Sequence, residues 1–99
     1  MALASTPMIL LASRFPIGRF MATPTAVKAL PPADIETALR RHAVGDWGDV
    51  DEEDRRQNDL SLQQGLRLLS AYRATNGTKF WIITEADRSV TTVLLPEDY

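Results

Sequence analysis

The sequence predicts an α+β fold, with two to three helices packed on one face of a three- to four-stranded antiparallel sheet. Segments of amphipathic helical spacing occupy the first two thirds of the chain, and three segments rich in β-branched and aromatic residues occupy the last third. The chain has 99 residues, of which 44% are hydrophobic, and this suits one modest core. We therefore expect a single domain over residues 14–99, preceded by a flexible leader at residues 1–13, which show no periodicity.

The domain should begin with a short edge strand and a helix. Residues 14–22 alternate loosely between apolar and polar, but Pro16 and Gly18 weaken the pattern. Thr23-Pro24 is a typical helix start, because a hydroxyl N-cap precedes proline at the first helical position. The apolar face of this helix should consist of Ala26, Val27 and Leu30.

A second helix is predicted from Pro32 to about Ala43. Ile35, Leu39 and either His42 or Ala43 form one amphipathic stripe. Acidic residues in the first turn and arginines in the last complement the helix dipole, and Gly45 should end the helix. A polar loop and a third helix over residues 52–64 should follow, with Leu60 and Leu62 as its anchors.

The last third predicts a three-stranded antiparallel meander over residues 66–74, 79–85 and 90–95. Asn76-Gly77 favours a type I′ turn between the first two strands, and residues 86–89 form the second reversal. Large apolar side chains alternate onto both faces of the middle strand. We therefore expect that strand to be covered on both sides, or to present one side to a partner.

Composition excludes several classes of function. The net charge is −2, so a basic field over the whole chain for holding nucleic acid is absent. The sequence has no cysteine, which excludes disulfides and thiolate chemistry. The apolar stretch near the start, residues 7–12, is far shorter than the roughly 20 residues that span a bilayer. We expect a cytoplasmic protein without a membrane segment and without a cofactor.

Two stretches of the sequence are distinctive. One runs from Arg41 to Val50 and continues to Asn58, and the other runs from Arg67 to Tyr99 and contains the string Thr84-Glu85-Ala86-Asp87-Arg88-Ser89. Together they resemble a family of small, largely uncharacterised proteins of bacterial plasmids and integrative elements. The resemblance covers residues from about 14 to 99.

This resemblance implies a setting, mobile-element cargo, and no activity that can be assigned to particular residues. Members of the family are sometimes labelled as the modification subunit of a type I restriction system. That label does not suit this chain, because its five glycines include no G-x-G-x-x-G arrangement of the kind that a nucleotide-cofactor fold requires. Cargo of this kind often serves maintenance, transfer or inhibition of host defences, including anti-restriction and anti-CRISPR inhibitors.

The leading candidate site is an acidic segment that contains a tryptophan. Trp47 lies between two glycines, and it either fills the core or is an exposed anchor for a partner. The carboxylates are either a solvated loop, a metal site or a surface that faces a protein, and the EF-hand spacing fails. The predicted partner-binding residues are Asp46, Trp47, Asp49, Asp51, Glu52, Glu53 and Asp54. The leading hypothesis is a non-enzymatic accessory protein that binds another protein through this segment, with inhibition of a host defence system as a specific role.

The alternative hypothesis is a small hydrolase or nuclease. His42, the one histidine, would act as general base with Asp46, Glu85 or Asp87, or it is only a helix-end residue. Glu85, Asp87 and Arg88 in the second turn form a secondary candidate site, for which local ion pairing is the other reading.

A third hypothesis is an accessory protein that binds nucleic acid. Scattered basic residues could gather on one sheet face with Tyr72 and Trp81, a combination that suits single strands. Those basic residues are Arg14, Arg19, Arg67, Arg73, Lys79 and Arg88. The oligomeric state has no signature in the sequence.

Overall fold

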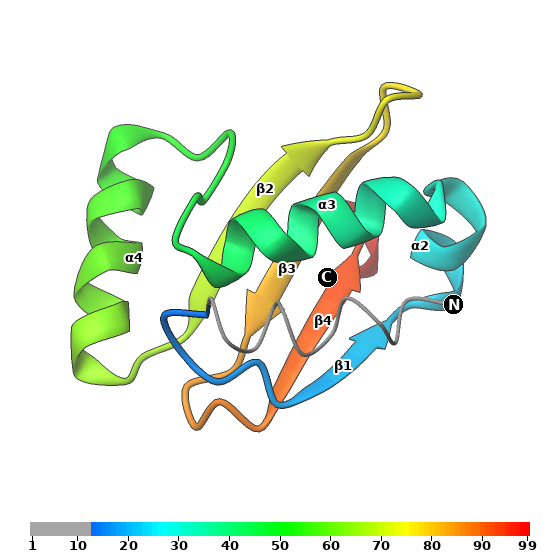
Figure 1. Cartoon of the computed structure of the whole chain (residues 1–99). Coiled ribbons are helices and arrows are strands. Elements are labelled where there is room, and N and C mark those ends of the chain that lie inside the picture. Colours follow the sequence, from blue (N-terminus) through cyan, green and yellow to red (C-terminus); the bar gives the residue numbers. More distant parts are fainter. Residues whose placement is uncertain (1–12) are drawn as a thin grey trace.

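The computed structural model describes residues 13–99, so the expected leader lies outside the described residues except for Ser13. The described chain contains, in order, β1 (Arg19–Ala22), α2 (Pro24–Ala29), α3 (Pro32–Ala43), α4 (Glu52–Gln64), β2 (Leu68–Arg73), β3 (Lys79–Thr84), β4 (Val90–Leu94) and the 3-10 helix η2 (Pro96–Asp98). The predicted α+β class is confirmed (Figure 1).

The four strands form one sheet in the order β1-β4-β3-β2. The meander β2-β3-β4 is antiparallel, as predicted. The expectation of an antiparallel sheet throughout is wrong, because β1 pairs with β4 in parallel, with Arg19 opposite Val90. Parallel neighbours need a long crossover connection, and here the helices and the rest of the meander provide it.

Helix α3 lies across one face of the sheet, and α2 packs beside β4 (Figure 1). Thr23 caps α2 by accepting a hydrogen bond from the backbone of Ala26 at 3.1 Å. Val27 was predicted to face the core but is 60% exposed, because the short helix turns only Ala26 and Leu30 inward. The main core between helices and sheet consists of Ala26, Leu30, Ala38, Tyr72, Ala74, Phe80, Ile82, Val93 and Leu95.

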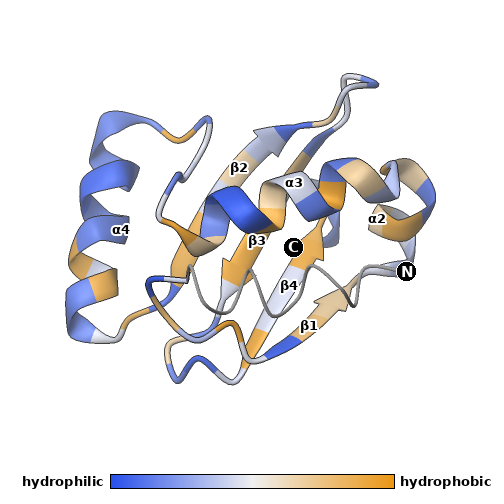
Figure 2. Cartoon of the chain, viewed as in Figure 1, coloured by the Kyte–Doolittle hydropathy of each residue, from blue (hydrophilic) through white to orange (hydrophobic). Residues whose placement is uncertain are grey.

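Helix α4 covers the β2 edge of the sheet and is largely hydrophilic (Figures 1 and 2). Its attachment to the sheet is polar: the buried Asn58 amide donates to the Leu69 carbonyl at 2.7 Å and accepts from the Leu69 N–H at 3.0 Å. The prediction that Leu60 anchors this helix is wrong, since Leu60 is 42% exposed. Leu62, the other predicted anchor, does pack against a second core cluster. The Asn58 amide, rather than the Leu60 side chain, therefore attaches α4 to the edge of β2.

The first hairpin turn differs from the predicted type. Gly77 alone has positive φ, 88°, whereas a type I′ turn needs positive φ at Asn76 as well. The Gly77 N–H donates to the Ala74 carbonyl at 2.9 Å, and the Ala74 N–H donates to the Thr78 carbonyl at 2.8 Å. These bonds define a three-residue loop that ends in a left-handed glycine.

Candidate functional site

The indole of Trp47 is sealed inside the protein, so the prediction that it anchors a partner is wrong. Only 1% of Trp47 is exposed. Its ring stacks on Phe15 at 6.3 Å between centroids and meets the edge of the His42 ring at 5.7 Å. Its Nε1–H donates to the Asp59 carboxylate at 3.0 Å. The alternative interpretation, that Trp47 fills the core where α3 ends, is confirmed.

The backbone around Trp47 explains why its ring turns inward. The Ala71 N–H donates to the Trp47 carbonyl at 3.0 Å, and the Asp49 N–H donates to the Ala71 carbonyl at 2.7 Å. Gly48 bridges Ala71 in parallel, so residues 47–49 extend the sheet beyond β2. A Cβ at Gly48 would lie 2.0 Å from the Ala71 carbonyl oxygen, which only glycine avoids. Gly48 therefore permits the close backbone pairing with Ala71.

Two of the six predicted carboxylates, those of Asp46 and Asp51, accept hydrogen bonds within the chain. Asp46 accepts from Arg41 at 2.8 and 3.2 Å and from the Gly48 N–H at 3.2 Å, and the bond to Arg41 lowers the pKa of its carboxyl. Asp51 caps α4 by accepting from the Asp54 N–H at 2.8 Å.

The remaining four acids, Asp49, Glu52, Glu53 and Asp54, are exposed, and Glu52 pairs with two arginines of its own helix at 3.4 and 3.7 Å. An acidic surface is present, without an aromatic anchor. Within residues 13–99, no cluster of histidine, aspartate and glutamate suited to holding a metal ion occurs.

His42 belongs to the core, which contradicts its proposed role as a general base. It is 0% exposed. Its Nδ1 lies 2.6 Å from the Ser70 hydroxyl and its Nε2 lies 2.8 Å from the Thr84 hydroxyl, so neither nitrogen contacts Asp46, Glu85 or Asp87. A base needs a route to substrate, and this ring has none.

The hydroxyls around His42 determine its tautomer. Thr91 donates to the Ile17 carbonyl at 2.6 Å, so its oxygen accepts from Thr84 at 2.7 Å. Because Thr84 uses its hydroxyl hydrogen in the bond to Thr91, its oxygen can only accept from His42. Nε2 of His42 must therefore carry the proton. Nδ1 consequently accepts from Ser70. Burial, followed by the charge of Arg88, lowers the pKa of His42 to about 3, so the ring is neutral.

The second hairpin turn uses its charged residues to hold the fold. The Arg88 guanidinium donates to the carbonyls of Leu66 at 2.6 Å and Ser61 at 3.1 Å, and it lies over the Phe15 ring at 5.7 Å. Asp87 accepts from the Ser89 N–H at 2.9 Å, which closes the turn. Glu85 pairs with Arg67 at 3.9 Å. Arg88 also donates to the Glu85 carbonyl at 3.2 Å, but the side chains of Glu85, Asp87 and Arg88 have different partners.

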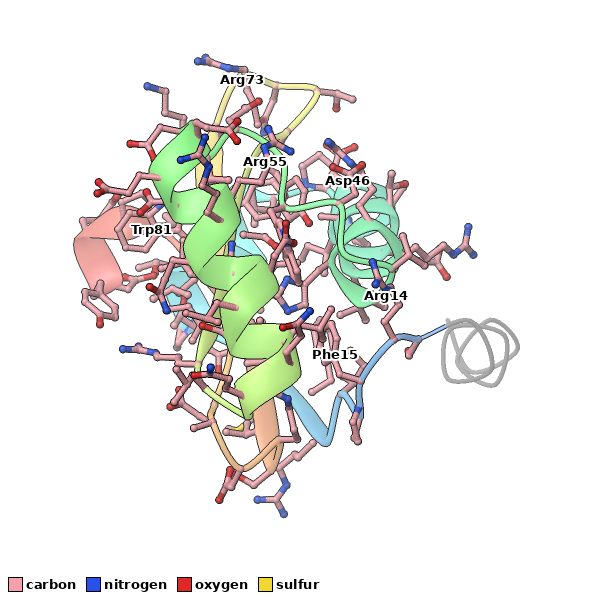
Figure 3. The ribbon with its side chains drawn as sticks, turned by 90° about the vertical axis from the view of Figure 1, so that its left-hand side faces the viewer. Arg14, Phe15, Asp46, Arg55, Arg73 and Trp81 are labelled. Atoms are coloured by element: carbon pink, nitrogen blue, oxygen red, sulfur yellow. The ribbon has the colours of Figure 1, made fainter. Side chains whose placement is uncertain are left out.

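The sheet face opposite α3, called here the outer face, carries aromatic and basic side chains that do not belong to the core between the helices and the sheet. Trp81 projects from this face, away from Arg14 and Asp46, which lie on the side of α3 (Figure 3). Tyr99 meets Trp81 edge to face at 5.7 Å, and its hydroxyl accepts from Arg67 at 2.7 Å. By strand register the outer face consists of Arg19, Met21, Leu69, Ala71, Arg73, Lys79, Trp81, Ile83, Val90, Thr92 and Leu94.

Part of the predicted basic and aromatic group does gather on this face. Arg73 lies directly opposite Lys79 in the register, two residues from the Ala71–Trp81 pair, and both are exposed. Neither side chain makes a hydrogen bond or an ion pair within residues 13–99. The prediction that Tyr72 belongs to this group is wrong, since Tyr72 is buried on the opposite face and donates to the Asp46 carbonyl at 2.6 Å. Arg88 is engaged elsewhere, as described above.

Strand alternation correctly placed Trp81 and Ile83 on one face and Phe80 and Ile82 on the other. The role of Tyr99 had no such signal, because the residue lies beyond the last strand and reaches Trp81 only through the turn of η2.

A hollow beside the outer face is lined by Asp49, Ala71, Tyr72, Arg73, Lys79, Phe80, Trp81 and Pro96. No helix of the described residues is long and apolar enough to cross a membrane. Comparison of the chain with protein-family models, with curated proteins and with solved structures gave no match.

Proposed function

We propose that this chain is a non-enzymatic binding protein that docks another protein on its outer face. The observation that carries the proposal is the cluster of Trp81, Tyr99 and Arg67 on a sheet face that α3 does not cover. Tryptophan, tyrosine and arginine are the residue types that dominate binding energy at protein interfaces. The proposal keeps the leading hypothesis of protein binding and moves its surface from residues 46–54 to the outer face.

The charges beside Trp81 indicate the chemistry of the partner. Arg73 and Lys79 are exposed cations without partners among the described residues, and they adjoin the hollow that Trp81 lines. A partner that offers carboxylates to these two residues and an apolar side chain to the hollow would complement both. We infer an acidic protein surface as the ligand class.

The biological setting of the proposal comes from the resemblance to plasmid-encoded proteins. A small binding protein carried by a mobile element suits inhibition of a host defence complex, of anti-CRISPR or anti-restriction type. This role is tested by plasmid transformation into a strain with an active defence system, with and without the chain expressed. Inhibition predicts a rise in transformation that Arg73→Glu with Lys79→Glu abolishes.

Affinity capture from lysates of the natural host tests the surface. The double variant Arg73→Glu with Lys79→Glu should lose the partners that the wild-type chain captures. A matched control, Glu53→Gln with Asp54→Asn, removes two charges from the acidic surface at residues that do not line the hollow, and it should retain them. The opposite pattern would return the docking site to residues 46–54, and insensitivity to both variants would exclude both surfaces.

Single-stranded nucleic acid is the second candidate ligand, because Arg73, Lys79 and Trp81 share one face by register and Arg67 reaches it through its bond to Tyr99. Two observations rank it below protein. The Arg67 guanidinium lies 5.1 Å from the centre of the Tyr99 ring and already pairs with Glu85 at 3.9 Å, so neither the Tyr99 face nor the Arg67 charge is free for a nucleotide. Binding of a labelled oligonucleotide at two salt concentrations tests this candidate, since phosphate contacts predict a steep loss at the higher salt.

A further inference from the structure

The outer edge of β1 is the one edge of the sheet that the described residues leave uncovered. At the opposite edge, the β2 backbone is paired with Asn58 and with residues 47–49. Among the described residues, strand β1 is paired only with β4, and it carries two exposed apolar side chains, Phe20 at 42% and Met21 at 49%. Proteins usually protect such an edge, because its free backbone groups can pair with another strand.

The hydrogen bonds of β1 define which backbone groups are free. The Arg19 N–H donates to the Ser89 carbonyl and the Thr23 N–H donates to the Val93 carbonyl, each at 3.0 Å. Alternate residues of a strand direct their backbone groups to opposite edges, so those of Phe20 and Ala22 point outward. The edge therefore offers two donors and two acceptors, spaced two residues apart.

We propose that β1 pairs antiparallel with β1 of a second copy of this chain, about a two-fold axis at Met21. In this register Phe20 lies opposite the partner's Ala22, and each such pair exchanges two backbone hydrogen bonds. The two Met21 side chains meet at the axis as a pair that is not hydrogen-bonded. The same surface serves both copies, as a two-fold interface requires.

Charge complementarity favours this occupant. The register places Arg19 of one copy beside Thr23 of the other, and the Thr23 hydroxyl donates to the Asp98 carboxylate at 2.7 Å. The Arg19 side chain is exposed and has no partner among the described residues, and Asp98 is exposed as well. Two arginine–aspartate pairs therefore flank the Met21 axis. The strand is only four residues long, so the interface is small and the dimer should be weak.

Sedimentation of the full chain over a concentration series tests the proposal. We expect a monomer–dimer equilibrium that Met21→Lys weakens at least about tenfold, since the two lysines would face each other at the axis. The matched control is Val27→Lys, a similar change at a residue 60% exposed on α2, which should leave the dimer intact. Arg73→Glu with Lys79→Glu should also leave it intact, which separates this test from that of the outer face.

Cross-linking tests the register, because the natural sequence contains no cysteine. Residues opposite each other in a pair that is not hydrogen-bonded have Cα atoms about 4.5 Å apart, within disulfide range. Met21→Cys should therefore cross-link with oxidised glutathione at least about tenfold faster than Phe20→Cys, whose copies lie apart.

Three outcomes would overturn the proposal. They are a full chain that stays monomeric, a dimer that Met21→Lys does not weaken, and a Phe20→Cys variant that cross-links as fast as Met21→Cys. A dimer that forms only after deletion of residues 1–12 would also overturn it, because the chain's own first residues would then occupy the edge.

Discussion

At the residue scale, the polar core around His42 is complete. Each imidazole nitrogen has one hydroxyl partner, and the hydroxyls continue through Thr91 to the Ile17 carbonyl. No buried side-chain nitrogen or oxygen among the described residues lacks a hydrogen-bond partner. Loss of one partner or addition of a charge should destabilise such a network, because the protein interior cannot solvate an unpaired polar group or an ion.

The first prediction concerns pH. The unfolded chain protonates His42 near its ordinary pKa of 6.5, whereas the folded chain does so only near 3. The unfolded state therefore binds the extra proton between these values, so stability is fully present above about pH 6.5 and falls as the pH decreases toward 3. The free energy of unfolding should fall by up to about 1.4 kcal/mol per pH unit, measured by urea denaturation.

The control for this prediction is His42→Gln, which has no titrating ring. Its stability should be nearly flat from pH 6.5 to pH 4, even if it is lower throughout. The pKa values of Asp46 and Asp98, lowered by hydrogen bonds from Arg41 and Thr25 respectively, lie below their ordinary 3.8, so these carboxylates act only at lower pH. An equal slope in wild type and His42→Gln would contradict the assignment.

The second prediction concerns Trp47. Trp47→Ala should destabilise the chain by about 3–5 kcal/mol, because it leaves a cavity between Phe15 and His42. Trp47→Phe keeps part of the packing and loses the bond to Asp59, so it should cost less than half as much. Circular dichroism during denaturation measures both. A loss of only a few tenths of a kcal/mol in Trp47→Ala would mean that the ring is not in the core.

At the scale of elements, short contacts to the backbone of β2 join two segments to the edge of the sheet. Residues 47–49 add a bridge to β2, and Asn58 caps the same strand from α4. Both contacts occur at an edge strand, where free backbone groups would otherwise be left without partners.

The third prediction compares two glycines with similar backbone conformations. Gly48 has φ 76° and Gly65 has φ 69°, but only at Gly48 would a Cβ collide with backbone. Gly48→Ala should destabilise the protein by more than about 2 kcal/mol. Gly65→Ala should cost only about 1 kcal/mol, the price of left-handed backbone in open space. Equal losses in thermal denaturation would contradict the close pairing of Gly48 with Ala71.

At the scale of the whole molecule, the sheet has two different sides. One side holds α3 and the core, and the outer face holds Trp81, Tyr99 and their cations (Figure 3). Helix α4 stands at the edge between them and depends on polar contacts with the rest of the protein. This arrangement leaves the region around Trp81 on the outer face and the backbone edge of β1 uncovered by the helices of the described residues.

The fourth prediction tests how α4 is attached. Arg88→Ala removes donors from the carbonyls of Leu66 and Ser61 and should cost about 1–3 kcal/mol. Hydrogen exchange should accelerate most in the second half of α4 and in residues 65–68. Arg56→Ala, which breaks an exposed pair with Glu52, is the control and should cost at most about 1 kcal/mol. Exchange that rises uniformly along the chain would indicate general destabilisation instead.

Local patterns in the sequence were sufficient for the fold class and for the bounds of α3 and α4. Proline, capping residues and apolar spacing act within a few residues, so the helix from Pro32 to Ala43 could be read directly. The same holds for the alternation that placed Trp81 and Phe80 on opposite faces of β3.

Only the tertiary structure decided the candidate site. Whether Trp47 faces the core depends on Ala71, 24 positions along the chain, and whether His42 can act as a base depends on Ser70 and Thr84. The parallel pairing of β1 with β4 likewise joins residues about 70 positions apart. Contacts across such separations leave no periodic signal, because they depend on which backbone and hydroxyl groups the folded chain brings together.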